Sequence, residues 1–397
     1  MASTSTPSKR NRSSETKRAL LGAVLGASFT LLTIDWIESY IRYVRASPLA
    51  GWQYFLYLAV GFLTMRLLIT AVHEGGHFLA AYLLKFRCLT YVVAWLYVER
   101  KGARWQVRLK RKPGKIMGYV RAVPAAGPHL QRGLAIYFLG GILANIVTGS
   151  AALLAGKALA DSQIFAASPA LAFVLVQALY LFGGLSIFIG LANLIPFTTP
   201  TKHTSDGGYV LRLLRGGASL QRQLALYTLS SVSHAGTRPR NWDAEVVKQL
   251  LTAPDGSSFD CTSHFYTYLY HLDNQDFTQA EFHLGKALGL LPLTTAEVQQ
   301  QLCCEATYFA ATHTHDVAQA ELWLAKAQQI KPFEAEEGLL AQATVAGATG
   351  NDAAARKWLA ALSGQLADIN DLASQLLLSE RIATQQLELN RRAVLQA

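Results

Sequence analysis

Long runs of apolar residues without a charged side chain are the feature that most constrains this chain. Residues 162–201 hold no Asp, Glu, Lys or Arg over 40 positions, and residues 133–156 hold none over 24. A helix needs about 20 apolar residues to cross the roughly 30 Å hydrocarbon core of a bilayer. Charged residues make up 16% of the chain, against about 25% in soluble proteins. The sequence therefore predicts a membrane protein with a soluble part.

The charge-free runs predict four spanning helices. The first follows a polar, basic cytoplasmic tail at residues 1–18 and, with the outer loop after it, occupies residues 19–50. A cleaved signal peptide is the alternative for this segment, but its aromatic and acidic flank at residues 35–40 does not resemble a small-residue cleavage site. The second span is too long for one straight crossing, so it must tilt, break or extend into water. The predicted spans are about 19–40, 52–84, 133–157 and 168–195.

The distribution of lysine and arginine predicts the orientation of these helices, because cytoplasmic loops carry an excess of both. Five lie in residues 1–18 and twelve in residues 85–132, but Lys157 alone lies at the loop after the third span. Both termini are therefore predicted to be cytoplasmic. No nucleic-acid-binding motif accompanies the net charge of +10, so the charge is interpreted as a topology signal and no nucleic-acid partner is expected.

Between the second and third predicted spans the pattern changes to that of β-structure. Residues 90–98 are β-branched and aromatic, residues 100–103 have the composition of a turn, and residues 105–110 alternate with period two. A further short strand is predicted at residues 117–123. The sequence thus predicts a small basic β-hairpin at about residues 89–123, packed at the cytoplasmic face of the membrane in an otherwise all-α protein.

Residues 216–397 have the composition of a soluble, cytoplasmic helical domain. Three segments align with offsets of 40 and 35 residues, and a proline follows each of the first two at the same distance. A period near 34 residues is typical of tetratricopeptide repeats, and an irregular helical bundle is the alternative. The predicted role is binding of a cytoplasmic protein partner or self-association. The aligned segments are 280–287, 320–327 and 355–362.

The most informative motif is His-Glu-Gly-Gly-His at residues 73–77, inside the second predicted span. Residues four apart share one face of a helix, so His73 and His77 can bind one zinc ion. Glu74, beside that face, can take a proton from zinc-bound water. Ionisable groups in a membrane cost roughly 2.5–3.5 kcal/mol each and usually have a function. A buried polar cluster that holds helices together is the alternative.

A catalytic zinc ion binds three protein ligands and a water molecule, so a third ligand is needed. Asp206, just beyond the cytoplasmic end of the fourth predicted span, is the predicted third ligand, and His203 is its rival. A further alternative is that Ser205 or Asp206 only caps a helix that starts at Tyr209. The four cysteines form no C-x-x-C pair, which argues against a cysteine zinc site.

Together these motifs resemble those of the site-2 protease family of intramembrane zinc metalloproteases. That family combines a membrane-embedded H-E-x-x-H motif with an Asn-Pro-Asp-Gly motif two spans later, and with a glycine- and asparagine-bearing span between them. The similarity covers about residues 50–210, within a predicted protease core at residues 51–215. Besides residues 73–77, the matching residues are Gly140, Gly141, Asn145, Asn193, Pro196, Asp206 and Gly207.

The resemblance implies a zinc endopeptidase that cleaves transmembrane segments of other membrane proteins, with Glu74 as catalytic base. It implies that the hairpin guides the substrate, and it makes Asn145 and Asn193 tentative contacts to the substrate backbone or the oxyanion. Hydrogen bonds between helices are the alternative for both asparagines. By analogy with the family, the expected location is the inner (plasma) membrane of a bacterium. The implied zinc ligands are His73, His77 and Asp206.

The chain also departs from the family. Asp206 lies ten residues after Pro196, a longer spacing than is usual, and the outer loops of about ten residues leave no room for a PDZ-like insertion. One alternative function is a non-catalytic membrane scaffold that binds partners through its helical repeats. Another is a different membrane zinc protease, which would take a glutamate ligand from a later helix. No E-x-x-x-D pattern follows in the remaining spans, which argues against this second alternative.

Overall fold

The computed structural model describes Ile34, Glu38, Ile41, Arg42, Arg45, Leu49 and residues 51–110, 117–162, 164, 167–197, 204–330, 333 and 336–396. Most of the predicted first span and the rival ligand His203 lie outside these residues. The chain divides into two compact units. The first unit comprises the chain up to Arg66 together with Val147–Ile187. The second unit comprises Leu67–Ile146 and Phe188–Ala397.

Three helices within the described ranges are long and apolar enough to cross a membrane. They coincide with the second, third and fourth predicted spans. The presence of a fourth membrane-spanning helix, at residues 19–40, stays a prediction. The second predicted span is one continuous helix without a break. Its apolar side chains are widely exposed, with Phe55 at 74% and Leu63 at 63%, as suits contact with lipid better than with water. The helices are α2 (Gly51–Leu83), α3 (Leu130–Ala160) and α4 (Pro169–Leu194).

In the first unit, α3 and α4 approach closely through two glycines. A Cβ atom placed on Gly149 would lie 2.9 Å from the carbonyl oxygen of Gly183, and one on Gly183 would lie 2.8 Å from that of Gly149. Small residues allow such contacts between membrane helices, where packing replaces the hydrophobic effect as the source of attraction. On α2, the Tyr57 hydroxyl donates a hydrogen bond to the carbonyl of Val174, at 3.1 Å.

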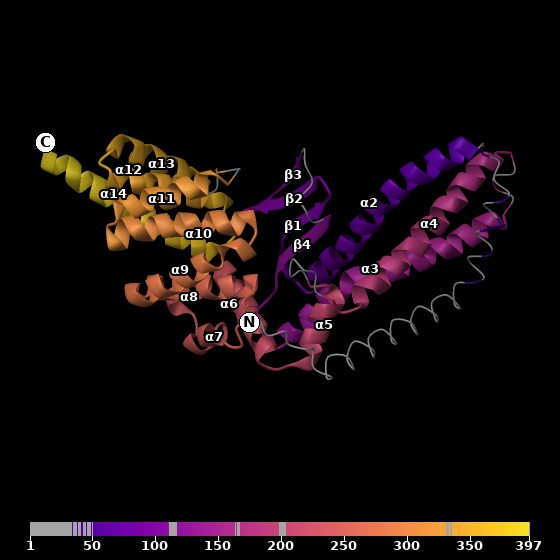
Figure 1. Cartoon of the computed structure of the whole chain (residues 1–397), viewed down its shortest axis with the longest axis horizontal. Helices are drawn as coiled ribbons and strands as arrows, with labels where there is room; N and C mark the ends of the chain where they lie inside the picture. The colour runs from indigo at the N-terminus through magenta and orange to yellow at the C-terminus, as the bar shows by residue number, and fades with distance from the viewer. Residues whose placement is uncertain are drawn as a thin grey trace, which may run out of the picture. The chain divides into compact units, whose positions relative to one another are not determined.

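The second unit holds an antiparallel sheet of four strands in the order β3-β2-β1-β4 (Figure 1). The predicted hairpin is present as β2 and β3, which pair across the turn after Lys101, but it is part of this larger sheet. Ala94 adopts a left-handed backbone (φ 52°) and turns the chain inside the stretch predicted as one strand, without a glycine or asparagine to mark the turn. The strand predicted at 117–123 is confirmed. The strands are β1 (Arg87–Val93), β2 (Leu96–Lys101), β3 (Arg104–Leu109) and β4 (Gly118–Val123).

After α4, the described chain is helical apart from connecting turns. Three consecutive helix pairs, α8–α9, α10–α11 and α12–α13, pack as neighbours in the second unit (Figure 1). Each of the three aligned sequence segments lies on the second helix of one pair. The helices are α5 (Asp206–Arg215), α6 (Ala218–His234), α7 (Ala244–Gln249), α8 (Ser258–Asp273), α9 (Phe277–Gly289), α10 (Ala296–Phe309), α11 (Val317–Gln328), α12 (Glu336–Ala348), α13 (Asp352–Gln365) and α14 (Leu372–Gln396).

The second helices of the three pairs begin in the same way. A residue with positive φ is followed by an Asp or Asn whose side chain accepts a hydrogen bond from the backbone N–H three residues on. A buried alanine comes four residues after each cap. The repeat therefore exists in the structure, whereas its assignment to the tetratricopeptide class stays a prediction. The three starts are Gln275-Asp276, His315-Asp316 and Gly350-Asn351.

The sheet is attached to the helical region at the β2–β3 turn. The backbone N–H of Gly102 donates to the carbonyl of Asp368, at 3.0 Å. The side-chain amide of Asn370 donates to the carbonyl of Arg100, at 2.5 Å. Two hydrogen bonds thus connect this turn to the segment that leads into α14.

We expect Asn370→Ala to loosen this attachment, because it removes one of the two hydrogen bonds. A net loss of about 1 kcal/mol corresponds to roughly fivefold faster amide hydrogen exchange at Gly102. Asn274→Ala is the matched control, because the Asn274 amide bonds only to the carbonyl of Tyr270 in its own helix end. Unchanged exchange at Gly102 in Asn370→Ala would contradict the prediction.

Candidate metal centre

Three predicted ligands meet at one point in the second unit. His73 and His77 lie one turn apart on α2, and their Nε2 atoms are 3.3 Å apart. Oδ2 of Asp206 lies 3.0 Å from Nε2 of His73 and 3.4 Å from Nε2 of His77. Within the described ranges, this is the one group of three or more His, Cys, Asp or Glu side chains whose donor atoms converge.

Close packing of α2 on α3 brings the backbone of α3 next to the two histidines. A Cβ on Gly76 would lie 2.3 Å from the carbonyl oxygen of Gly140, a distance that no real Cβ contact tolerates. The backbone of α3 therefore approaches α2 closely at Gly76. At Gly75 a Cβ would meet nothing within 4 Å, so no segment of the described chain lies against that residue.

Gly141 on α3 faces the ligand atoms directly. A Cβ at this position would lie 2.5 Å from Nε2 of His77 and 2.9 Å from Nε2 of His73. Glycine is thus the residue that leaves space around both nitrogens. The site therefore contains a small open space beside the two imidazoles, which any side chain on Gly141 would fill.

Asp206 reaches the histidines because Ser205 takes over the capping role. The Ser205 hydroxyl accepts from the N–H of Gly208 and donates to the carbonyl of Ile195, at 3.2 and 2.8 Å. Helix α5 begins at Asp206, so the predicted start at Tyr209 is wrong by three residues. The capping alternative therefore applies to Ser205, and the carboxylate of Asp206 is left to face α2.

The electrostatics at Asp206 favour an ionised carboxylate. Burial by itself would raise the pKa of Asp206, but hydrogen bonds with His73 and His77 outweigh it and lower the pKa to about 2. The side chain is 18% exposed. A carboxylate that stays charged and is largely shielded from water is suited to binding a cation.

Each histidine is oriented by a group on α3. Nδ1 of His77 lies 2.7 Å from the carbonyl oxygen of Tyr137, which can only accept, so Nδ1 carries a proton. Nε2 of His77 faces Asp206 and is the nitrogen that would bind a metal. The amide Nδ2 of Asn145 lies 3.2 Å from Nδ1 of His73. If Nε2 of His73 bound a metal, Nδ1 of His73 would carry the proton. The side-chain amide of Asn145, flipped by 180°, would then present its oxygen to that proton.

Glu74 points toward the sheet. It is 7% exposed, and a Cβ on Gly118, the first residue of β4, would lie 2.9 Å from Oε1 of Glu74. The nearby His77 and His73 interact electrostatically with its carboxylate. A buried carboxylate beside the ligand cluster is placed where it could exchange protons in the site.

The two tentative asparagines differ in their surroundings. Asn145 is fully buried next to His73, which favours a role in orienting that ligand, while its contact with a substrate stays a prediction. Asn193, near the end of α4, is half-buried, and its side chain makes no hydrogen bond within the described chain. Its role as a substrate contact likewise stays a prediction.

Sequence reasoning missed Tyr137 and Gly118. Tyr137 carries a signal that could have revealed it, because Tyr137, Gly141 and Asn145 follow one another at intervals of four and so share one face of α3. Gly118 carries none, since its place over Glu74 depends on how the sheet packs on α2.

The spacing of the three donor atoms can be compared with that of a tetrahedral zinc site, and two of the three separations match it. With zinc–ligand bonds of about 2.0–2.2 Å, neighbouring ligand atoms of a tetrahedron lie about 3.3–3.6 Å apart. The three separations here are 3.0, 3.3 and 3.4 Å. Two imidazoles and one carboxylate are a donor set that could hold a zinc ion and would leave its fourth position to water or substrate.

Comparisons with known proteins add no relative. No family model matches the chain, and neither a curated protein nor a solved structure matches it. The resemblance to the site-2 protease family therefore rests on the motifs alone.

Proposed function

We propose that this protein is an intramembrane zinc endopeptidase that cleaves transmembrane segments of other membrane proteins. The observation that carries the proposal is the convergence of His73, His77 and Asp206 beside the buried carboxylate of Glu74, at a membrane-length helix. Ionisable groups in such a helix are costly and usually serve a function. A polar cluster with a purely structural role would not need Gly141 to keep the space around two imidazole nitrogens open.

The residues divide the chemistry between them. A zinc ion bound by the three ligands would polarise the scissile carbonyl and lower the pKa of a water molecule toward 7. Glu74 takes a proton from a water molecule in the site and returns it to the amine that leaves. Tyr137 and Asn145 hold the two imidazoles so that their Nε2 atoms face Asp206.

A transmembrane substrate has to unwind before it can be cut, because all its backbone groups are bonded inside its own helix. Strand β3 can hold the unwound segment as an added strand, since it lies at the edge of the sheet. The ring of Trp105 on β3 packs against Phe78, which lies one helical turn beyond Glu74 on α2. The free edge of the sheet is thus close to the metal centre along α2.

The register of the sheet identifies which backbone groups of β3 are available. The N–H of Lys110 donates to the carbonyl of Trp95, so the even-numbered residues of β3 bond to β2. The N–H and carbonyl groups of Trp105, Val107 and Leu109 therefore point away from the sheet. An exposed edge with apolar side chains, 67% exposed at Val107, is a surface that favours pairing with another strand.

The remaining parts of the proposal concern location and partners. We infer a bacterial inner membrane, both termini in the cytoplasm and a lipid bilayer around α2, α3 and α4. The repeated helix pairs would bind a cytoplasmic protein partner or a second copy of the chain, as stacked helical repeats do. The loop charges support the orientation of the termini, and the helix pairs support the partner binding. The bacterial inner membrane follows only from the resemblance to the site-2 protease family.

Metal analysis and a cleavage assay test the proposal together. Purified protein in liposomes should hold about one zinc per chain and cut at least one of a panel of single-span membrane proteins. Chelation should stop the cleavage, and added zinc should restore it. Asp206→Ala should lose the metal, because two imidazoles alone bind it weakly.

Asp352→Ala is the matched control, because Asp352 is also the first residue of a helix, α13, but lies in the helical repeats. Absence of zinc from the wild type would overturn the proposal and favour the scaffold function. Unchanged zinc in Asp206→Ala would reject Asp206 as the third ligand.

A further inference from the structure

Tyr137 contacts the ligand His77 in two ways. Its backbone carbonyl accepts the Nδ1 proton of the imidazole, at 2.7 Å. Its ring packs on the imidazole with 5.3 Å between the ring centres and 41° between the ring planes. Tyr137 therefore fixes both the protonation and the tilt of this ligand.

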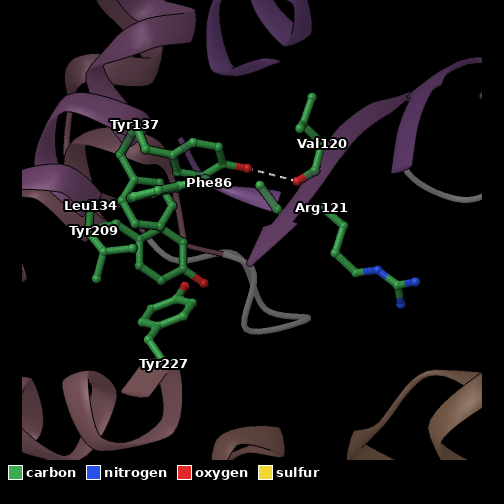
Figure 2. Close-up of a pocket in the computed structure, with 9 residues that line it drawn as sticks. Phe86, Val120, Arg121, Leu134, Tyr137, Tyr209 and Tyr227 are labelled. Atoms are coloured by element: carbon green, nitrogen blue, oxygen red, sulfur yellow. Dashed lines mark hydrogen bonds between the residues drawn. The ribbon is translucent and has the colours of Figure 1, made fainter. Parts of the chain in front are cut away.

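The hydroxyl of Tyr137 connects the same side chain to the sheet. It donates to the carbonyl of Val120 in β4, at 2.8 Å, as Figure 2 shows. Two residues earlier on this strand, Gly118 lies against Glu74. Strand β4 thus contacts the proposed catalytic base directly and the ligand His77 through Tyr137.

The hydroxyl bond matters because packing leaves room beside the ring. A cavity of about 210 Å³ borders Tyr137, with Phe86, Leu134, Tyr209 and Tyr227 among its walls (Figure 2). A ring next to a cavity can change its rotamer without displacing neighbours. The bond to Val120 therefore restrains the ring beside this space, together with the ring contacts to Phe86 and Phe138.

We propose that Tyr137 is a positioning residue that sets the geometry of the metal ligand His77 by reference to strand β4. The inference rests on the proposed function in one respect, that His73, His77 and Asp206 bind a divalent metal. It adds a link between the sheet, where the substrate would pair, and the metal centre. Groups that orient a metal-bound imidazole change metal affinity by about 10–100-fold when they are lost.

The test compares Tyr137→Phe with Tyr91→Phe in the full-length protein. Tyr137→Phe keeps the ring and the backbone carbonyl and removes only the bond to β4. Tyr91→Phe is the matched control, because the Tyr91 hydroxyl also joins the sheet to a membrane helix, through the carbonyl of Ala71 at 2.9 Å, but touches no ligand. Zinc affinity is measured by competition with a chelator, and the ligand geometry by the visible absorption of the cobalt(II)-loaded protein.

We expect Tyr137→Phe to weaken zinc binding about tenfold and to shift the cobalt spectrum, with neither change in Tyr91→Phe. A loss less than threefold greater than that of the control, or an unchanged cobalt spectrum, would overturn the inference. These outcomes are separate from the fate of the proposed function. Zinc bound equally by both variants rejects only the role of Tyr137, whereas zinc binding without cleavage of any substrate rejects only the protease.

Discussion

Replacing Glu74 by glutamine should leave zinc in place and reduce cleavage of the substrate by about 10²–10⁴-fold, the usual contribution of a general base. Glutamine has nearly the same shape and fits the space between α2 and Gly118, but it cannot take a proton from water. Because Glu74 is not a metal ligand in this arrangement, the metal content should stay that of the wild type. Initial rates in liposomes and metal analysis of the same sample measure the two effects.

Glu99→Gln is the matched control for this experiment. Glu99 lies on β2 and undergoes the same chemical change in the sheet, away from the ligand cluster. Its cleavage rate should stay that of the wild type. Cleavage by Glu74→Gln at the wild-type rate, with zinc bound, would show that another group activates the nucleophile and would remove Glu74 from the mechanism.

The second large effect is expected from Gly141→Ala, which adds one methyl group to the protein. Its carbon would lie 2.5 Å from Nε2 of His77 and 2.9 Å from Nε2 of His73, so both imidazoles must move from the position that faces Asp206. We expect zinc affinity to fall by at least about 100-fold, the upper end of the effect of misplacing a ligand. Cleavage should be lost with the metal.

Gly75→Ala separates this effect from a change in helix stability. Both substitutions raise helix propensity by about 1 kcal/mol, but a Cβ on Gly75 meets nothing within 4 Å although the residue lies between the two histidines in sequence. Gly75→Ala should keep wild-type zinc affinity. Equal zinc affinities in the two variants would mean that the space at Gly141 is not needed for metal binding.

Several features of this protein follow from local sequence alone. Charge-free runs identify α2, α3 and α4, because the requirement of about 20 apolar residues per crossing is independent of the rest of the fold. The four-residue interval of His73 and His77 places both on one helix face. The aligned segments of the C-terminal region identify the second helices of the three pairs, because each repeat has the same cap and the same buried alanine.

Other features required the tertiary structure. The turn at Ala94 carries no turn residue, so the sheet cannot be told from a hairpin by its pattern. The placement of Gly118 over Glu74 depends on contacts between segments more than 40 residues apart in the chain. Local preferences contain no information about such contacts, since they are decided by which faces of two elements pack together.

The ligand set illustrates both contributions. The sequence determined that two histidines and a glutamate lie at one point of an apolar helix, because helical geometry relates residues one to four positions apart. It left Asp206, His203 and a simple helix cap as competing interpretations of one loop. Only the packing of α5 against the end of α4, with Ser205 as the cap, decided that the carboxylate of Asp206 faces the two imidazoles. Asp206 and His73 are 133 residues apart in the sequence, and only the fold brings them into contact.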